Sequence, residues 1–313
     1  MQKSNHYFFI DAVNKRIQEK DNEILSFQEE FYRMEAGSVG EKKLKLVLDD
    51  YPFKNEYSIF YNFECMNDRG FSHQIDALLI TPFFILILEV KQISGTLCYK
   101  PALHEFYRIT ENKLRENFPN PFDQTFRHKL FLEQFLLQFN IVIPIHELVV
   151  IANYRAQLDD SLKGLPIIHL SGLPRYLENL FATYTSPLVN ISMIDKKLQQ
   201  IHQPLPARRS IEAHRLKHGV LCKKCNYCYK MHYARGNWIC EKCNSNDRSA
   251  LFEALHHYRV LIRPTISNKE FRDFVGIDSK FTASKILTRL GLEKHGDKKG
   301  RYYVIPEDIF YKE

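Results

Sequence analysis

The sequence predicts an α/β domain built on a mixed sheet, followed by a small zinc ribbon and a winged-helix module. Three observations lead to this fold class. Apolar strand-like runs alternate with amphipathic helical stretches over residues 35–201, two C-x-x-C pairs follow, and three helical stretches with a basic hairpin end the chain. With 313 residues, 44% of them hydrophobic, the chain is long enough for two or three domains with real cores.

Composition also limits where the protein works. No apolar run reaches the roughly 20 residues that span a bilayer. The apolar patch near the first residues is too short for a signal sequence and lacks a small-residue cleavage site. Four of the seven cysteines have a metal-binding spacing, while Cys65 and Cys98 are isolated thiols. We therefore expect a soluble cytoplasmic protein with no membrane partner.

Changes in composition divide the chain into five segments. Residues 202–210, HQPLPARRS, contain two prolines and a basic pair, a pattern typical of a domain boundary. We expect a helical lead-in over 1–34, the α/β domain over 35–201, a linker over 202–217, the zinc ribbon over 218–246 and the winged helix over 247–313.

The net charge of +7 is concentrated in the C-terminal third. From Ala207 onward there are 22 Lys and Arg against 12 Asp and Glu, which gives +10 and leaves −3 for the first 206 residues. A solvated lysine-rich surface explains such an excess as readily as nucleic acid does. Nucleic acid becomes the better interpretation only if this third also has a suitable fold.

The N-terminal 50 residues predict helices. Apolar residues recur at helical spacing within 3–36 and indicate one or two amphipathic helices that lead into the first domain. A further helix is expected to begin near Ser38, a plausible cap flanked by Gly37 and Gly40. Glu41 then lies in the first turn, where the helix dipole alone would stabilise a carboxylate.

Residues 73–95, HQIDALLITPFFILILEVKQISG, organise the first domain. Two apolar runs, 77–80 and 83–88, are separated by Thr81 and Pro82 and predict a pair of buried strands. Asp76 enters the first run, and Glu89 and Lys91 leave the second on alternate residues, so their side chains share one strand face. Buried charges need partners, which here means mutual pairing or a divalent cation.

The rest of this domain alternates strands and helices. Residues 57–64 predict a strand, the stretch 96–113 two short strands, and 146–154 and 166–172 one buried strand each. A strongly amphipathic helix starts at Asn120-Pro121 and carries Gln124 in its first turns. Its apolar side is expected to comprise Phe126, Leu130, Phe131, Phe135 and Leu136. A second helix is predicted over 173–184.

Four cysteines predict a zinc site. Cys222 and Cys225 form one pair and Cys240 and Cys243 the other, with 14 residues between the pairs, a spacing suited to tetrahedral zinc. Cys228 and His232 could replace one ligand, but the paired spacing favours the four cysteines. Four thiolates leave zinc no open position, so we expect a structural site.

The last segment predicts a winged helix. Three helical stretches precede the ribbon LEKHGDKKGRYYVIP, whose tip is basic. In such a module the third helix can enter the major groove while the wing touches phosphate, although similar modules also contact proteins. The candidate nucleic-acid-binding residues are Lys280, Lys285 and Arg289 on the third helix, and Lys298, Lys299 and Arg301 on the wing.

Several motifs occur in a characteristic order, and together they resemble a known family. They are Gly37-x-x-Gly40-Glu41, Gln74-x-Asp76, Glu89-x-Lys91 followed by Gly95, and Asn120-Pro121 ahead of Gln124. Residues 35 to about 155 resemble the nuclease-related domain (NERD) family of the restriction-endonuclease-like superfamily. The remainder is similar to bacterial proteins that append a zinc ribbon and a winged helix to this domain.

The resemblance implies a metal-dependent DNA endonuclease or exonuclease of the PD-(D/E)xK type. Asp76 and Glu89 would ligate Mg²⁺ or Mn²⁺, and Glu41 would contribute directly or through water. Lys91 would orient or deprotonate the attacking water, and Gln74 and Gln124 would hold the site by hydrogen bonds. The DNA partner could be single-stranded, duplex or branched, and the sequence leaves a homo-oligomer open.

Two other functions are compatible with the sequence. The first is a DNA-binding or adaptor protein whose nuclease-like domain no longer cuts. The second is a transcription regulator acting through the winged helix, which would leave Asp76, Glu89 and Lys91 unexplained. Because a domain that no longer cuts is free to lose any of these three residues, their presence together favours the nuclease.

Overall fold

The computed structural model describes residues 3–311, with the side chains of Lys299 and Tyr311 excepted, and divides the chain into two compact units. The sheet unit is built mainly from Arg33–Leu205. The ribbon unit combines Asn5–Tyr32 with the described chain from Pro206 onward. Among the described helices, none has the length and apolar character needed to cross a membrane.

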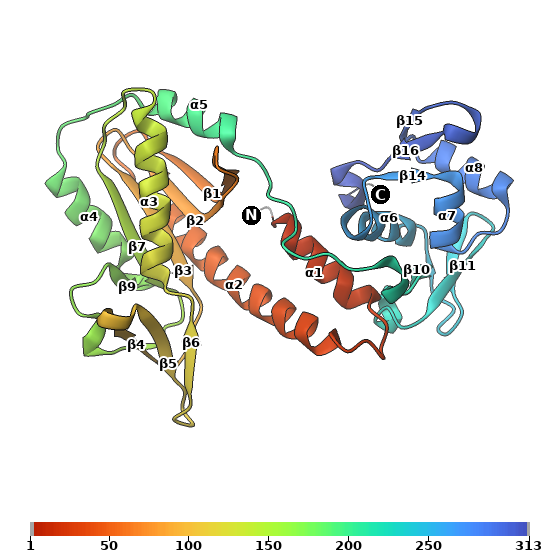
Figure 1. Cartoon of the computed structure of the whole chain (residues 1–313), viewed down its shortest axis with the longest axis horizontal. Helices are drawn as coiled ribbons and strands as arrows, with labels where there is room; N and C mark the ends of the chain where they lie inside the picture. Colours follow the sequence, from red (N-terminus) through yellow and green to blue (C-terminus); the bar gives the residue numbers. More distant parts are fainter. Residues whose placement is uncertain (1–2, 312–313) are drawn as a thin grey trace. The chain divides into compact units, whose positions relative to one another are not determined.

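A five-stranded mixed sheet forms the centre of the sheet unit, which confirms the predicted α/β class (Figure 1). Its strand order is β1-β2-β3-β7-β9; the first three strands are antiparallel, and β3, β7 and β9 run parallel. The strands are β1 Ser58–Met66, β2 Ser72–Ile80, β3 Ile85–Lys91, β7 Ile145–Ile151 and β9 Ile167–His169.

The two apolar runs pair as predicted. Ala77 faces Leu88 and Ile80 faces Ile85 across β2 and β3. The Thr81 hydroxyl closes the turn by donating to the Phe84 carbonyl and accepting from the Phe84 amide. Because β3 has β2 on one side and β7 on the other, the residues that follow its apolar run lie at the end of a central strand.

Four helices cover the two faces of this sheet. On one face α2 (Ile24–Asp50) and α4 (Leu173–Thr183) bury Leu44, Leu48 and Leu177 against Leu86 and Leu88. On the other, α3 (Pro121–Leu137) and α5 (Ile191–Ile201) form a second core with Ile85 and Ile87 of β3. Since the two faces of β3 are covered, its side chains alternate between two separate cores.

Three strands inserted between β3 and α3 form a smaller sheet together with β8, which follows β7. Its strand order is β6-β5-β4-β8. Its strands are β4 Thr96–Lys100, β5 Glu105–Ile109, β6 Arg115–Phe118 and β8 Gln157–Leu158. Gly95 enters it at φ +90°, and a Cβ there would lie 2.6 Å from the Ile109 carbonyl oxygen, so only glycine fits.

The expected helix start at Ser38 is wrong. Helix α2 runs without a break from Ile24 to Asp50, so Ser38 is no cap and Glu41 lies in the helix interior rather than in a first turn. Gly40 has a packing role instead: a Cβ there would lie 3.2 Å from the Cβ of Gln92 and 3.5 Å from Val90. The missing side chain lets α2 approach the end of β3 closely.

Helix α3 begins where predicted, with Asn120 as its N-cap accepting from the Phe122 amide, but its expected apolar side is partly wrong. Phe126 and Leu130 are 51% and 42% exposed. The buried positions are Pro121, Thr125, His128, Leu132 and Leu136. The apolar arc of α3 is wider than the core can cover, so one of its edges stays at the surface.

The ribbon unit shares one hydrophobic core. Val220 and Trp238, from the cysteine-rich sheet, pack in the same core as Leu255 and Phe271 from the helices that follow. The sheet consists of β10 Val220–Leu221, β11 Lys230–Ala234, β12 Asn237–Cys240 and β13 Asn246–Asp247. The segments expected as two separate domains, 218–246 and 247–313, therefore pack as one body.

Three helices and a three-stranded sheet complete the ribbon unit. The predicted three helices and terminal hairpin are both present. The elements are α6 Ala250–Leu261, β14 Thr265–Ser267, α7 Asn268–Val275, α8 Lys280–Arg289, β15 Glu293–His295 and β16 Tyr302–Val304, with strand order β14-β16-β15.

The first helix of the N-terminal segment packs in the ribbon unit, and the second, α2, continues into the sheet unit. Helix α1 (Asn5–Arg16) lies against α6, and Arg16 is fully buried there. Its guanidinium donates to the carbonyls of Lys217 and Gly219 and to Nδ1 of His257. These contacts join residues more than 200 positions apart in sequence, which helical periodicity alone does not reveal.

Candidate functional site

The candidate active site begins where the alternation of β2 breaks. Ile75 and Ala77, two positions apart, belong to cores on opposite faces of the sheet. Asp76 lies at this break, and the pairing of β2 with β3 ends at Ala77 and Leu88. One carboxylate oxygen of Asp76 accepts from the Val90 amide at 2.8 Å. The Asp76 side chain thus accepts a hydrogen bond from the β3 backbone just beyond the point where the backbone pairing of β2 and β3 ends.

Asn62 makes the same break in β1, and the sequence analysis missed it. Its φ of +53° is left-handed, which asparagine tolerates better than most residues. Tyr61 and Phe63 on either side of it contact different cores. The Asn62 side chain hydrogen-bonds Glu41. An asparagine within the aromatic strand YSIFYNFE was the signal that could have identified it.

Glu89 and Lys91 share one face of β3, as predicted. Lys91 Nζ donates to Glu89 Oε1 at 2.5 Å, and the side chains are 25% and 4% exposed, respectively. Glu89 Oε2 is also buried but has no hydrogen-bond partner among the described residues. A buried carboxylate oxygen without a donor is costly, so this atom needs a further ligand.

Three carboxylates interact in this region with one lysine. Burial raises the pKa of Asp76 well above its usual value, and the charges of Glu89 and Glu41 add to the effect. Burial also raises the pKa of Glu41, with Glu89 contributing. For Lys91, burial lowers the pKa, but Glu89 and Asp76 outweigh it and the net shift is upward. Fully ionised, the four groups would carry a charge of −2.

Gln74 and Gln124 have different positions relative to these carboxylates. Gln74 lies on β2 opposite Glu64 of β1, two residues before Asp76. Gln124 lies in the first turns of α3 and forms no hydrogen bond with the carboxylates among the described residues. Their predicted roles at the site stay predictions.

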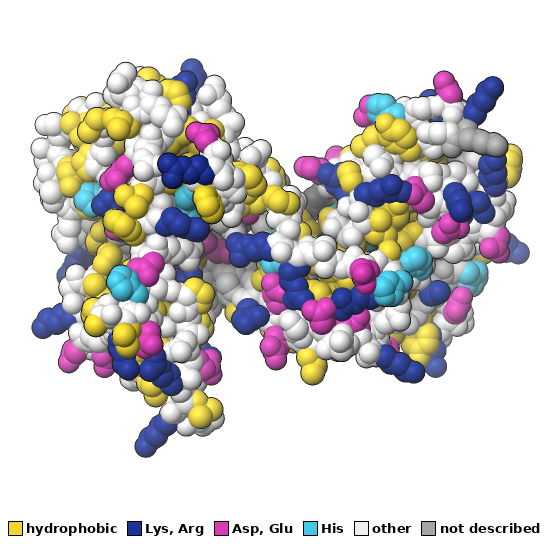
Figure 2. Space-filling model, viewed as in Figure 1, with side chains coloured by type: hydrophobic (Ala, Val, Ile, Leu, Met, Phe, Trp, Pro, Cys, Tyr) yellow, Lys and Arg dark blue, Asp and Glu magenta, His cyan; other side chains and the backbone are white. Residues whose placement is uncertain are grey.

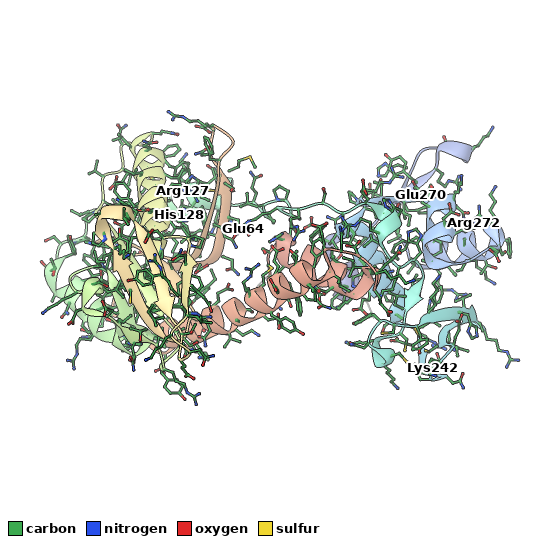
Figure 3. The ribbon with its side chains drawn as sticks, turned by 60° about the horizontal axis from the view of Figure 1, so that its bottom comes forward. Glu64, Arg127, His128, Lys242, Glu270 and Arg272 are labelled. Atoms are coloured by element: carbon green, nitrogen blue, oxygen red, sulfur yellow. The ribbon has the colours of Figure 1, made fainter. Side chains whose placement is uncertain are left out.

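A buried histidine pair lies between β2 and α3. His73 and His128 approach at 3.0 Å between their Nδ1 atoms. Figure 3 labels His128 next to Arg127 on α3. Burial lowers the pKa of His73 to about 4 and that of His128 to about 3, with nearby Arg127 contributing to both shifts and Lys91 to that of His128. Both rings are therefore neutral at neutral pH. Sequence reasoning missed this pair because neither histidine belongs to a recognisable motif.

The four predicted cysteines come together in the ribbon unit. Their sulfur atoms all lie within 4.8 Å of one another, and the Cys222–Cys243 and Cys225–Cys240 sulfurs are 3.7 and 3.8 Å apart. Tetrahedral zinc with sulfur at about 2.3 Å separates its ligands by about 3.8 Å, so the residues fit zinc. In the described chain, no other group of three His, Cys, Asp or Glu ligands meets this closeness.

Local structure supports this cysteine cluster. Asn226 and Asn244, each directly after the second cysteine of a pair, have left-handed φ of 51° and 55° and turn the chain back around the sulfurs. The amide of Lys242 donates to Cys240 Sγ, and Ser245 lowers the pKa of Cys243 to about 6 by hydrogen bonding. Cys228 and His232 are exposed and lie outside the cluster.

The candidate nucleic-acid-binding residues are exposed wherever the structure describes their side chains. Lys285 and Arg289 lie one turn apart on α8, Lys280 begins that helix, and Lys298 and Arg301 flank the hairpin tip. The side chain of Lys299 lies outside the described residues. On the face shown in Figure 2, basic (dark blue) and acidic (magenta) side chains are interspersed over the ribbon unit.

Comparison with known proteins identifies the domain that carries the carboxylates. The model of the family described as "Nuclease-related domain" (NERD) matches residues 36–152. Residues 36–152 are thus similar to a nuclease-related domain, and this range is called the NERD domain below. This range includes Glu41, Asp76, Glu89 and Lys91, and it extends through β4, β5, β6 and α3 to the end of β7.

Other comparisons add little to this NERD domain assignment. No curated protein matches the chain. Among solved structures, the chain is similar to the small subunit of the heterodimeric restriction endonuclease R.BspD6I, with 13% identity, over 54% of this chain and 84% of that one. The TM-score of 0.23 is too low for this similarity to bear on fold or function.

The buried histidine pair predicts acid sensitivity. Its folded-state pKa values lie below the unfolded value of about 6.5, so the unfolded chain binds more protons and stability falls as the pH drops below that value. Replacing His128→Gln should reduce this dependence by about 1.4 kcal/mol per pH unit.

Hydrogen exchange of peptides from β2 and α3 in the full chain, corrected for the intrinsic effect of pH, measures this dependence. The exposed His104 provides the control: His104→Gln should behave as the wild type. Equal pH dependence in His128→Gln and wild type would show that the pair does not govern acid stability.

Proposed function

We propose that the NERD domain is a metal-dependent nuclease of the PD-(D/E)xK type that hydrolyses phosphodiester bonds in DNA. The observation that carries the proposal is the buried Glu89 carboxylate, whose Oε1 is held by Lys91 and whose Oε2 has no partner among the described residues. The Val90 amide holds Asp76 beside it, so this arrangement provides two carboxylate ligands and one positively charged side chain, Lys91.

A divalent cation fits this site for a reason of charge. When all are ionised, the three carboxylates of Glu41, Asp76 and Glu89 exceed the single charge of Lys91 by two, and the raised pKa values of Glu41 and Asp76 reflect this excess together with burial. Carboxylate oxygens are preferred ligands of Mg²⁺ and Mn²⁺, and Mg²⁺ usually binds one or two of them together with water and phosphate oxygens. Asp76 and Glu89 would therefore hold the ion, with Glu41 contributing directly or through water.

When bound, such an ion lowers the pKa of water and offsets charge that develops on the phosphate. The chain's own residues have complementary roles. The Val90 amide fixes the Asp76 carboxylate, and Asn62 fixes that of Glu41. Lys91, two residues beyond Glu89 on β3, would orient or deprotonate the attacking water. Gln74 and Gln124 would complete the hydrogen bonding around the substrate.

The ribbon unit would bring the nuclease to DNA. A zinc ion on the four cysteines would hold the small sheet, while α8 and the hairpin would contact phosphates in the manner of a winged helix. The exposed side of α8 combines Lys285 and Arg289 with Phe281, which is 79% exposed. A large exposed aromatic beside two cations is typical of a binding surface.

The nuclease proposal predicts separate effects on cutting and folding. Asp76→Asn keeps an oxygen that can accept from the Val90 amide, so the fold should survive while DNA cleavage in Mg²⁺ or Mn²⁺ falls by at least about 100-fold. Lys91→Ala should also abolish cutting but should retain metal binding, because it removes a positive charge beside the ion. Asp123→Asn, on the exposed side of α3, should cut as the wild type does.

Cleavage of single-stranded, duplex and branched DNA should be measured beside the melting temperature for each variant. A purely structural ion cluster predicts instead that removing one charge destabilises the domain by about 3 to 5 kcal/mol. Unfolding of both variants, or a wild type that cuts no form of DNA, would favour the non-cleaving DNA-binding or adaptor protein.

The zinc proposal predicts about one tightly bound zinc per chain. Cys240→Ser should lose this metal, and because the cysteine-rich sheet shares its core with α6, it should loosen the whole ribbon unit. Cys228→Ser, which changes an exposed cysteine outside the cluster, should keep both metal and stability. Metal analysis that finds no zinc in the freshly purified wild type would contradict the proposal.

A further inference from the structure

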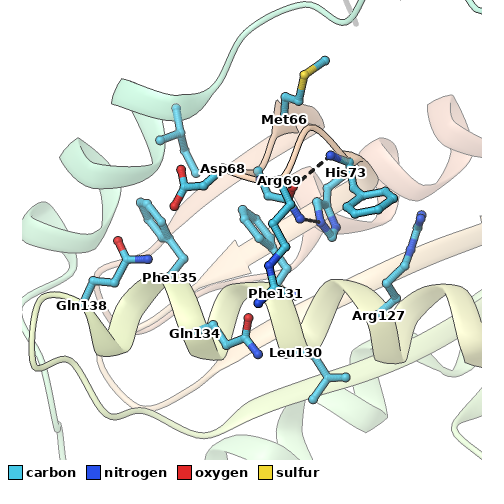
Figure 4. Close-up of a pocket in the computed structure, with 13 residues that line it drawn as sticks. Met66, Asp68, Arg69, His73, Arg127, Leu130, Phe131, Gln134, Phe135 and Gln138 are labelled. Carbon is cyan, nitrogen blue, oxygen red and sulfur yellow. Dashed lines mark hydrogen bonds between the residues drawn. The ribbon is translucent and has the colours of Figure 1, made fainter.

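A cavity of about 500 Å³ lies beside α3, away from the carboxylates (Figure 4). One wall is the turn between β1 and β2, and the other is the side of α3 that carries Leu130, Phe131 and Phe135. Cavities of about 300 to 1,000 Å³ are typical of small-molecule sites, so this one has room for a nucleotide. Neither the nuclease chemistry nor the zinc site uses it.

Aromatic rings line the α3 wall in a row. His73 stacks on Phe131 with 4.1 Å between ring centroids and 18° between planes, and Phe131 is followed by Phe135 at 6.0 Å and 24°. Phe71, on the opposite wall, is 62% exposed. Roughly parallel rings together with an exposed phenyl group provide faces on which a planar base can stack.

Polar groups border these rings. Arg69 extends from the turn toward α3, and Arg127 rises from the helix on the other side (Figure 4). Neither guanidinium forms an ion pair with a described residue. Gln134 adds an amide, and Asp68 adds a carboxylate that would repel phosphate but can accept from the amino group of a base. The two arginines suit a phosphate and the other groups suit a base.

The turn that forms one wall is held in place. The Asn67 side-chain oxygen accepts from the amides of Arg69 and Phe71 at 3.1 and 2.9 Å, and Gly70 supplies a left-handed φ of 78°. The Asn67 amide nitrogen lies 3.4 Å from His73 Nε2. Because these contacts fix the backbone, Arg69 and Phe71 are presented by a formed turn.

The cavity shares β2 with the candidate active site, because His73 and Asp76 both lie on this strand. His73 lines the cavity and contacts His128 of α3. His73 also directly precedes Gln74 on β2. A strand that reaches the carboxylates on the α3 side of the sheet would therefore pass close to the cavity.

We propose that this cavity binds one unpaired nucleotide of a nucleic-acid strand, with the base stacked among Phe71 and Phe131 and a phosphate held by Arg69 and Arg127. A base inside a duplex cannot present its faces, so the occupant is single-stranded or flipped out. This assignment rests on the proposed nuclease function only in taking DNA as the biological ligand. It makes single-stranded or frayed DNA the form that the NERD domain engages.

An apolar peptide is the competing occupant, and the charges argue against it. Two guanidiniums without carboxylate partners would be desolvated on a purely apolar surface, which costs free energy. A phosphate instead provides the planar, charge-assisted partner that arginine prefers. A peptide would also leave the glutamine and aspartate of the cavity without an obvious role.

The proposal is tested on the zinc-loaded full chain with no added Mg²⁺ or Mn²⁺, so that no cleavage is needed. A single-stranded thymidine oligonucleotide of about 12 residues carrying 5-iododeoxyuridine is photo-crosslinked, and the modified peptides are mapped by mass spectrometry. Binding is measured by fluorescence anisotropy at about 0.2 M salt, which weakens phosphate contacts made elsewhere. We expect crosslinks in residues 66–73 or in α3, and about tenfold weaker binding for Phe71→Ala.

Matched controls separate stacking from charge. Phe126→Ala removes an exposed phenyl group from the same helix outside the cavity and should bind as the wild type does. Arg69→Ala should weaken binding of both the thymidine oligonucleotide and an abasic oligonucleotide, whereas Phe71→Ala should weaken only the former. Crosslinks confined to residues beyond 205, or equal affinity of the wild type for the two oligonucleotides, would overturn the proposal.

These outcomes are independent of the nuclease test. A protein that crosslinks at the cavity but cuts no DNA would contradict the proposed nuclease and leave the nucleotide site in place. A protein that cuts DNA in Mg²⁺ but shows no crosslink at the cavity would retain the nuclease and lose the nucleotide site.

Discussion

Charge buried at the point where β2 and β3 separate is the constraint on which the candidate active site depends. Glu89 is placed inside the protein by the same apolar strand that builds both cores, with one of its oxygens bound to Lys91 and the other without a described partner. Asp76 and Glu41 add two carboxylates, and their raised pKa values reflect the free-energy cost of burying a negative charge there. A divalent cation would remove this cost, so in the proposed nuclease metal binding and catalysis would both follow from one arrangement.

The fold holds this arrangement from several directions. Gly40 brings α2 against the end of β3. The breaks in side-chain alternation at Asn62 and Asp76 lie opposite one another in β1 and β2. His128 contacts β2 from α3. These contacts come from segments distant in sequence. The site is therefore a property of the packed sheet unit rather than of one motif.

Much of this architecture follows from sequence pattern, because it depends on local physics. The apolar runs of β2 and β3, the Asn120 cap of α3 and the cysteine spacing each specify their own structure. The wrong predictions concern tertiary packing. Ser38 is a good cap residue, yet α2 continues through it, and α3 carries more apolar surface than its core covers. The amphipathic pattern of α1 does not indicate which unit this helix packs against, so the contact of Arg16 with His257 appears only in the structure.

Direct titration of the carboxylate site with Mn²⁺ tests the central claim, because it does not depend on knowing the substrate. Calorimetry on the zinc-loaded full chain should show one saturable site, and Glu89→Gln should lose it while the buried fold of β3 persists. Glu64→Gln, which changes another buried carboxylate of the same sheet, should leave it intact. The absence of saturable Mn²⁺ binding in the wild type, or equal binding by Glu89→Gln, would contradict the account.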